Sequence, residues 1–268
     1  MEFYTINNNH YFNLEPHVDM KELEDMYPDI VLGIVKAGLA GLIKDSGADT
    51  ENFLDKSIPS IINKTTATLK NKNNPYYKYY EELEFDLAAC RTFNKYVYEL
   101  STMGQLLYLR GYGTKGIQYK HVESRNADSP GYLYFPRFKQ WVNNLKIFDS
   151  IGRIIFWFNA PGEYGSIHRD TFIGYPDHFM LINLQPNRKE LFVVHPETGN
   201  HMPIPAKAYV FDTRNYHGTM GKDFSGFTIR IDGVYNKDWA ISAGIWDYFN
   251  PDNYNTQLET KTPEWSEY

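Results

Sequence analysis

Cysteine, surplus positive charge and long apolar runs are all scarce in this sequence of 268 residues. The single cysteine, Cys90, excludes an internal disulfide framework and a cysteine-based structural zinc site, and it favours a reducing, cytoplasmic setting. The 27 basic and 33 acidic residues give a net charge of −6, which argues against nucleic acid as a partner. The most apolar stretch, residues 30–43, is interrupted by Lys36 and too short to span a bilayer.

The first residues show neither the basic segment nor the apolar segment of a signal peptide. We therefore expect a soluble cytoplasmic protein that makes no use of a membrane. Hydrophobic residues make up 42% of the chain and aromatic residues 16%, which is enough to bury a core and favours β structure. One domain over residues 1–268 suits this length. The oligomeric state is left open.

Residues 1–110 are expected to form a mainly helical N-terminal layer. Asp19 and Glu22 form a capping pattern, which predicts a helix that starts at Met20. The apolar run 30–43 continues this layer, and residues 76–109 carry apolar groups at helical spacing. The polar, Lys- and Asn-rich residues 63–74 are typical of a solvated loop.

Residues 150–236 have a different pattern, with short β-rich runs separated by Gly, Pro, Asn and Asp. These runs are RIIFWFNA, HFMLINLQP, ELFVVHPETG, HMPIPAKAYVFD and GFTIRIDGVY. Short strands with this punctuation are typical of an antiparallel sandwich or barrel. The predicted fold class is mainly β, a barrel-like core with helical N-terminal additions, and the C-terminal tail 237–268 is expected to wrap around it.

The pair His168 and Asp170 follows the first clear strand. On a β-strand, residues i and i+2 project from the same face, so both side chains can bind one metal ion. The same spacing occurs at His17 and Asp19, but there a helix cap already accounts for the aspartate.

Two residues further along the chain strengthen the first pair. His217 ends the predicted strand KAYVFDTRNYH, and Arg230 lies in the next one, GFTIRIDGV. Two histidines and a carboxylate form the ligand triad of non-haem Fe(II) oxygenases, which leaves metal positions open. An arginine on the neighbouring strand offers two parallel donors to a carboxylate.

The strand that carries Arg230 has one polar face. Thr228, Arg230 and Asp232 alternate with apolar neighbours and so share a side of the strand. A lone strand of this kind is as well explained by a solvated face, but beside the triad a face that lines a ligand-binding interior is favoured.

This order of His-x-Asp, His and Arg on β-strands resembles the 2-oxoglutarate- and Fe(II)-dependent dioxygenases, whose core is a double-stranded β-helix of the jelly-roll or cupin type. The segments FWFNAPGEYGSIHRD, FMLINLQP and KAYVFDTRNYHGTMGKDFSGFTIRIDGVY look most like the aspartyl/asparaginyl hydroxylase and proline hydroxylase branch. The resemblance covers residues 151–235.

The resemblance implies that His168, Asp170 and His217 hold Fe(II), and that Arg230 binds the distal carboxylate of the cosubstrate 2-oxoglutarate. Asn183, an amide in an apolar run, is a second candidate contact to the cosubstrate. The reaction implied consumes O2 and 2-oxoglutarate, releases succinate and CO2, and hydroxylates an unactivated C–H bond. The substrate is expected to be an amino-acid-like small molecule or a peptide or protein side chain.

Three other functions stay open at the level of sequence. A cupin-type metalloenzyme could use the same triad without 2-oxoglutarate and without Arg230. A non-catalytic jelly-roll binding module would need no metal at all. An oxygenase acting on nucleic-acid bases is disfavoured by the net charge.

The remaining histidines and the residues beside the triad receive structural interpretations. His178 lies in a loop-like segment and is expected to be exposed, and His195 and His201 flank a predicted hairpin turn. Arg169 should point to the face opposite the metal ligands and form a structural ion pair, with substrate binding at the mouth of the site as the alternative. Trp157 is assigned to the core, with a contact to substrate as the alternative.

Overall fold

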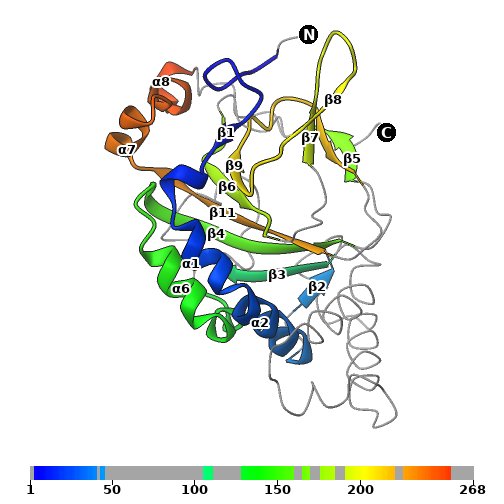
Figure 1. Ribbon diagram of the computed structural model, residues 1–268, viewed down its shortest axis with the longest axis vertical. Coiled ribbons are helices and arrows are strands. Elements are labelled where there is room, and N and C mark those ends of the chain that lie inside the picture. The colour runs from blue at the N-terminus through cyan, green and yellow to red at the C-terminus, as the bar shows by residue number, and fades with distance from the viewer. Residues whose placement is uncertain are drawn as a thin grey trace.

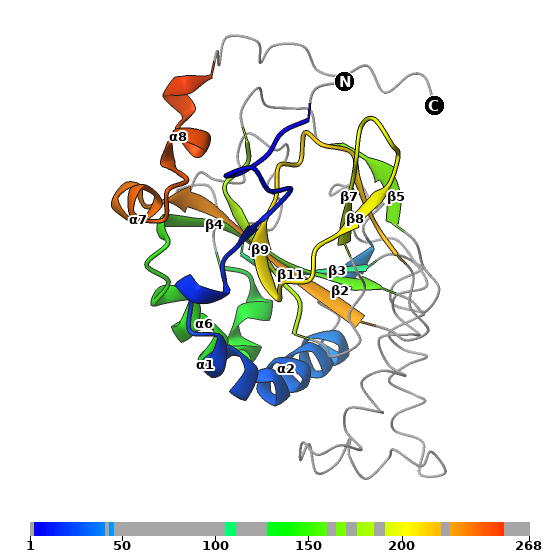
Figure 2. The same ribbon diagram turned by 45° about the horizontal axis from the view of Figure 1, so that its top comes forward.

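The computed structural model describes residues 3–40, 43–45, 105–110, 128–159, 165–169, 176–184, 191–220 and 226–254. Within these ranges the strands form two antiparallel sheets that face each other (Figures 1 and 2). The larger sheet has the order β1 (Phe12–Asn13), β9 (Ala208–Val210), β6 (Phe179–Ile182), β11 (Gly226–Tyr235), β4 (Phe148–Asn159), β3 (Gln105–Arg110) and β2 (Ile43–Asp45). The smaller sheet has the order β5 (Gly165–His168), β10 (His217–Thr219), β7 (Leu191–Val194) and β8 (His201–Pro203).

The chain passes between the two sheets in the manner of a jelly roll. Strands β4, β6, β9 and β11 lie in the larger sheet, and β5, β7, β8 and β10 lie in the smaller one. This alternation of eight antiparallel strands over two packed sheets is the double-stranded β-helix. The fold class predicted from the short, punctuated strand runs is therefore confirmed.

The outer face of the larger sheet is covered by helices α1 (Met20–Asp25), α2 (Tyr27–Leu39) and α6 (Pro136–Asn143) (Figure 1). The ring of Tyr27 stacks on Phe227 of β11, with centroids 6.1 Å apart, and Phe138 of α6 packs against Phe156 of β4 at 5.9 Å. These contacts assign the odd-numbered residues of β11 from Phe227 to Ile231 to the helical side, because strand side chains alternate between faces.

The even-numbered residues of β11 therefore face the interior between the two sheets. Arg230 lies opposite Leu181 of β6, and Asp232 lies opposite Phe179, so these side chains share the interior face. The ring of Phe179 contacts Phe211 at 5.6 Å, and Phe211 contacts His217 of the smaller sheet at 4.8 Å. The interior is thus a packed space that connects Arg230 to His217.

Helix α2 approaches the chain very closely at Gly33. A Cβ atom added there would lie 2.6 Å from Cε1 of Phe135 and 2.7 Å from the carbonyl oxygen of Tyr134, at the end of the 3-10 helix η4 (Pro130–Tyr134). Glycine is needed at this position because any side chain would overlap with backbone atoms.

The helical predictions for the N-terminal half are confirmed in part. Asp19 caps α1 by accepting a hydrogen bond from the backbone N–H of Glu22 at 2.9 Å, as the capping pattern predicts. The helical assignment was wrong at the C-terminal end of each apolar run: α2 ends at Leu39, with Ile43 in β2, and residues 105–110 form β3. These strands extend the larger sheet, and residues 46–104 lie outside the described ranges.

The C-terminal segment forms short helices in its described part. The helices α7 (Lys237–Ser242), α8 (Trp246–Phe249) and η5 (Pro251–Asn253) follow β11. Near the N-terminus, the short 3-10 helix η1 (Glu15–His17) precedes α1. Asn236 caps α7 by accepting a hydrogen bond from the N–H of Trp239 at 2.8 Å. The part of this segment that the structure describes packs on the core, because the ring of Phe249 contacts Tyr235 at 5.0 Å, and residues 255–268 lie outside the described ranges. Among the described helices, none combines the length and apolar character that a membrane span requires.

Candidate metal and cosubstrate site

His168 and His217 lie opposite each other on the neighbouring strands β5 and β10. Their ring centroids are 4.5 Å apart, so a single metal ion between the two rings is geometrically reasonable. Asp170, the third ligand predicted from the sequence, lies outside the described residues. The structure thus brings together two histidines that strands β6 to β9 separate along the chain.

The orientation of the His217 ring is fixed by a hydrogen bond. Its Nδ1 lies 2.9 Å from the backbone carbonyl oxygen of Asn215, and a carbonyl oxygen only accepts, so Nδ1 carries the proton. The neutral ring then has its lone pair on Nε2, the form in which histidine binds a metal ion. His217 is buried, whereas His168 is exposed, so the pair lies at the boundary between the interior and the solvent.

Arg230 occupies the interior face of β11 and is almost fully buried, with 6% of its side chain exposed. Its Nε donates to Oδ1 of Asp232 at 2.7 Å, and one terminal nitrogen donates to Oδ2 of Asp177 at 3.2 Å. The guanidinium carbon lies 4.2 Å from the centroid of the Phe179 ring. Arg230 is therefore held by two carboxylates of the protein itself and by an aromatic face.

A second arginine completes this interior charge cluster. Nε of Arg153 donates to Oδ2 of Asp232 at 2.9 Å, so Asp232 bridges two guanidinium groups. The cluster of Arg153, Arg230, Asp177 and Asp232 contains two positive and two negative charges. Balanced charges of this kind satisfy one another in a medium of low dielectric constant, and removal of one member leaves an uncompensated charge.

Asn183 follows β6 directly and is 3% exposed. Its backbone N–H donates to the carbonyl oxygen of Lys207 at 2.8 Å. By alternation along the strand it shares the interior side with Leu181, as its predicted role requires. Trp157 of β4 lies opposite Thr228 and 5.9 Å from the guanidinium carbon of Arg230, which gives it an interior position as well.

The interpretation of His178 as exposed was wrong. Its side chain is buried, Nδ1 accepts a hydrogen bond from the N–H of Tyr235 at 3.0 Å, and Nε2 donates to the carbonyl oxygen of Phe249 at 2.8 Å. The ring thus links the end of β11 to α8. His195 and His201 flank the β7–β8 hairpin as expected, with the turn residue Gly199 at a φ of 69°.

Arg169 makes a different contact from the one expected. Its guanidinium carbon lies 5.3 Å from the centroid of the Tyr216 ring, a cation–π contact beside the two histidines. In the described ranges, no group of three or more His, Cys, Asp or Glu side chains is arranged to hold a metal ion.

Sequence reasoning identified Asp232 as a neighbour of Arg230 on the same face but missed Asp177 and Arg153. Nothing in the local pattern around Asp177 connects it with β11, because the contact joins distant segments. It also missed Asn215, whose signal is only its place two residues before His217.

Neither a family model nor a curated protein matches this sequence. An oxidoreductase of the 2OG-Fe(II) oxygenase family from Burkholderia pseudomallei is 13% identical, with a TM-score of 0.32, over 48% of this chain and 64% of that one. A prolyl-4-hydroxylase from Pseudomonas putida is 10% identical, with a TM-score of 0.28, over 50% and 71%. An RmlC-like cupin protein from Desulfovibrio desulfuricans is 14% identical, with a TM-score of 0.23, over 33% and 76%. Similarity this low carries no information on activity, which has to be inferred from the residues of this chain.

Proposed function

We propose that this protein is an Fe(II)- and 2-oxoglutarate-dependent dioxygenase in which His168, Asp170 and His217 hold the metal ion. The observation that carries the proposal is the opposition of His168 and His217 across β5 and β10, with ring centroids 4.5 Å apart. When bound, Fe(II) would supply the redox chemistry that couples oxidation of 2-oxoglutarate by O2, to succinate and CO2, to hydroxylation of a C–H bond. The proposed compartment is the cytoplasm.

The residues present fit such a metal ion. The hydrogen bond from Nδ1 of His217 to Asn215 places the proton on Nδ1, so Nε2 is the nitrogen that would coordinate the metal ion. Two imidazoles and one carboxylate are a donor set suited to Fe(II), and they leave coordination positions for a chelating cosubstrate. His168 is exposed, so a substrate could approach a metal ion bound there from the solvent.

Arg230 is the proposed anchor for the distal carboxylate of 2-oxoglutarate, and Asn183 is a proposed further contact. A bound carboxylate would share the guanidinium group with Asp177 and Asp232. The bond to Asp177, at 3.2 Å, is the longer of the two and therefore the one more easily exchanged. The proposed substrate is an amino-acid-like small molecule or a peptide or protein side chain.

The test is anaerobic addition of Fe(II) and 2-oxoglutarate to the metal-free protein, followed by visible absorbance. The proposal predicts a weak charge-transfer band that is absent in His168→Ala. The band should also weaken when Arg230 is replaced, and Arg230→Gln combined with Asp177→Asn is the suitable variant, because Arg153 and Asp232 still balance each other. Absence of both the band and 2-oxoglutarate binding in the unaltered protein would overturn the proposal.

A second candidate, a cupin-type metalloenzyme without 2-oxoglutarate, is favoured by one observation. Arg230 is already paired with Asp232 and Asp177, as a purely structural arginine would be. This candidate predicts metal binding that depends on His168 and His217, no new band with 2-oxoglutarate, and metal affinity unchanged in the double variant. A protein that binds no divalent metal ion would instead be a jelly-roll binding module.

A further inference from the structure

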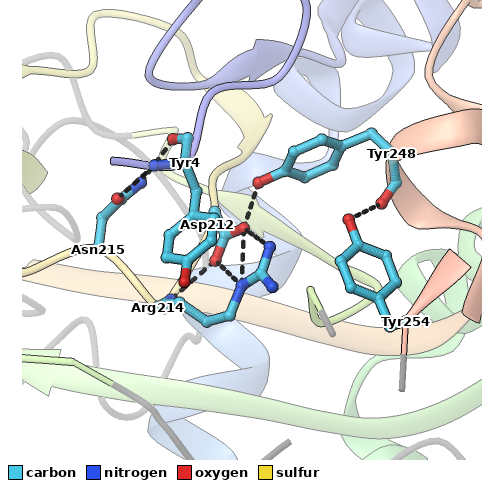
Figure 3. Close-up of polar contacts among 6 residues, drawn as sticks. All are labelled: Tyr4, Asp212, Arg214, Asn215, Tyr248 and Tyr254. Carbon is cyan, nitrogen blue, oxygen red and sulfur yellow. Dashed lines mark hydrogen bonds and ion pairs between the residues drawn. The ribbon is translucent and has the colours of Figure 1, made fainter. Parts of the chain in front are cut away.

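The loop between β9 and β10 carries a polar cluster that the proposed chemistry does not use (Figure 3). It joins this loop to both ends of the described chain, and we call it the clasp. Its members are Tyr4, Asp212, Arg214, Asn215, Tyr248 and Tyr254.

Asp212 and Arg214 form the centre of the clasp. Arg214 donates from Nε at 3.0 Å and from a terminal nitrogen at 2.6 Å to the two carboxylate oxygens of Asp212, whose side chain is fully buried. The backbone N–H of Arg214 also donates to Oδ1 at 2.8 Å, which closes a tight turn. A buried, two-pronged ion pair therefore fixes residues 212–214, the first part of the loop.

Aromatic residues from both chain ends pack on this pair. The hydroxyl of Tyr248 donates to Asp212, and burial followed by the charge of Asp212 raises the pKa of Tyr248, so the hydroxyl keeps its proton. The guanidinium carbon of Arg214 lies 3.9 Å from the ring centroid of Tyr4 and 5.1 Å from that of Tyr254. Figure 3 shows Tyr248 and Tyr254 approaching the loop from the C-terminal helices.

Asn215 connects the clasp to the candidate metal site. Its side-chain amide pairs with the backbone of Tyr4 in both directions: Oδ1 accepts from the N–H at 2.9 Å, and Nδ2 donates to the carbonyl oxygen at 2.7 Å. Its own carbonyl oxygen accepts the hydrogen bond from Nδ1 of His217. One residue thus fixes the N-terminal segment with its side chain and the His217 ring with its backbone.

We propose that Asn215 is a positioning residue for His217, and that attachment of the N-terminal segment through Tyr4 sets the tautomer and orientation of that ring. The proposal rests on the proposed function only in taking His217 as a metal ligand. Without the two bonds to Tyr4, the loop can rotate its carbonyl groups, and the His217 ring loses the acceptor that keeps the proton on Nδ1. Partners of this kind around a metal-binding histidine change metal affinity by roughly 10- to 100-fold.

The test compares Asn215→Ala with Asn236→Ala. Asn236 also uses both side-chain atoms, accepting from Trp239 at 2.8 Å and donating to Asp149 at 2.6 Å, but it lies at α7, in the cap of that helix. The first measurement is the ring tautomer of His217 in the metal-free protein, by nitrogen NMR at a pH above the usual imidazole range. The second is the affinity for Co(II), by titration of its visible absorbance.

Asn215→Ala should shift the His217 proton from Nδ1 towards Nε2 and weaken Co(II) binding by about 10-fold or more. Asn236→Ala should leave the His217 tautomer and the Co(II) affinity unchanged, while it lowers the unfolding midpoint about as much as Asn215→Ala does. Tyr4→Pro removes the N–H that donates to Asn215, together with the ring that packs on Arg214. It should move the His217 tautomer and the Co(II) affinity in the same direction as Asn215→Ala does. If Asn215→Ala does not fold, Tyr4→Pro provides the test of the positioning role.

An unchanged tautomer in Asn215→Ala and Tyr4→Pro would overturn the positioning role. Equal losses of Co(II) affinity in Asn215→Ala and Asn236→Ala would overturn it too, because the effect would then be one of general stability. If the unaltered protein binds no Co(II), the proposed function fails, and the tautomer measurement still decides the role of Asn215.

Discussion

The two sheets hold their candidate functional residues in different ways. In the larger sheet, β11 pairs with β4 on one side and β6 on the other, and its residues are buried at nearly every position around Arg230. In the smaller sheet the strands have three or four residues, and Ile167 and His168 are exposed on its edge strand β5. Arg230 is held by Asp232 of its own strand and by Asp177 just before β6, whereas His217 depends on contacts from the loop that precedes it.

Because of this difference, substitutions in the larger sheet should affect mainly stability, and substitutions at the histidine pair should affect mainly metal binding. Charges in the interior charge cluster compensate one another, so their loss should appear in the free energy of unfolding. The histidine pair has an exposed member and lies on short strands, so its loss should appear in metal binding instead. Substitutions in the two sheets therefore provide a direct way to test the contrast.

The largest loss of stability is expected for Asp232→Asn. Asp232 is fully buried and accepts hydrogen bonds from Arg230 at 2.7 Å and from Arg153 at 2.9 Å, so the substitution removes the negative charge that bridges the two guanidinium groups. We expect a loss of about 3 to 5 kcal/mol in the free energy of unfolding, as for other broken buried ion pairs. Urea denaturation measures it.

The double variant Arg230→Gln with Asp177→Asn is the control for this prediction, because it removes one charge of each sign. The double variant should lower the free energy of unfolding clearly less than Asp232→Asn does. An Asp232→Asn protein as stable as the unaltered one would show that the cluster is not what holds the interior of the large sheet.

Gly33→Ala tests the helical side of the same sheet. The added methyl group would lie 2.6 Å from Phe135 and 2.7 Å from the carbonyl oxygen of Tyr134. Overpacking of this kind typically costs about 1 to 3 kcal/mol, which thermal unfolding would detect. Gly199→Ala serves as a comparison, because no atom lies within 4 Å of the added group and only the positive φ of 69° opposes it. Equal stability of Gly33→Ala and the unaltered protein would contradict the close approach.

The sequence predicts the parts of this protein that depend on local patterns. Alternation along GFTIRIDGV places Thr228, Arg230 and Asp232 on one face, and the capping pattern at Asp19 starts α1 at the right residue. The pairing of His168 with His217 follows from the order of strands once a jelly roll is assumed. The alternation and the capping pattern depend only on residues that are neighbours along the chain.

Contacts between distant segments were not predictable in this way. The bond from Arg230 to Asp177, the two bonds from Asn215 to Tyr4 and the burial of His178 against Phe249 each join positions far apart in the sequence. Residues 105–110 illustrate a second cause of error: apolar residues on a strand buried in a sheet also fit a helical spacing, and only the pairing with β4 decides.

Tyr132→Phe should have a smaller effect, and one that depends on pH. The buried hydroxyl of Tyr132 makes no hydrogen bond to any described residue, so its removal should change stability by less than about 1 kcal/mol at neutral pH. Burial, and then the charge of Asp128, raise the pKa of Tyr132 in the folded state. This tyrosine therefore favours folding fully below the unfolded pKa of about 10, and stability is lost as the pH rises above it.

The measurement is urea denaturation at several alkaline pH values. Tyr132→Phe should retain about 1.4 kcal/mol more stability for each pH unit above about 10 than the unaltered protein does. Parallel curves for the two proteins would show that Tyr132 ionises equally well when folded.

The smallest change in stability, and the largest in binding, is expected for His168→Ala. The side chain is exposed on edge strand β5, so the free energy of unfolding should change by no more than about 0.5 kcal/mol. Metal affinity should fall by more than the roughly 10- to 100-fold seen when a supporting residue is lost. His201→Ala is the matched control: it removes another exposed histidine of the same sheet, stacked on Phe192 at 3.8 Å, away from the proposed ligands. Equal effects of the two substitutions on Co(II) affinity would show that the smaller sheet holds no metal site at His168, and the contrast between the sheets would then be one of packing alone.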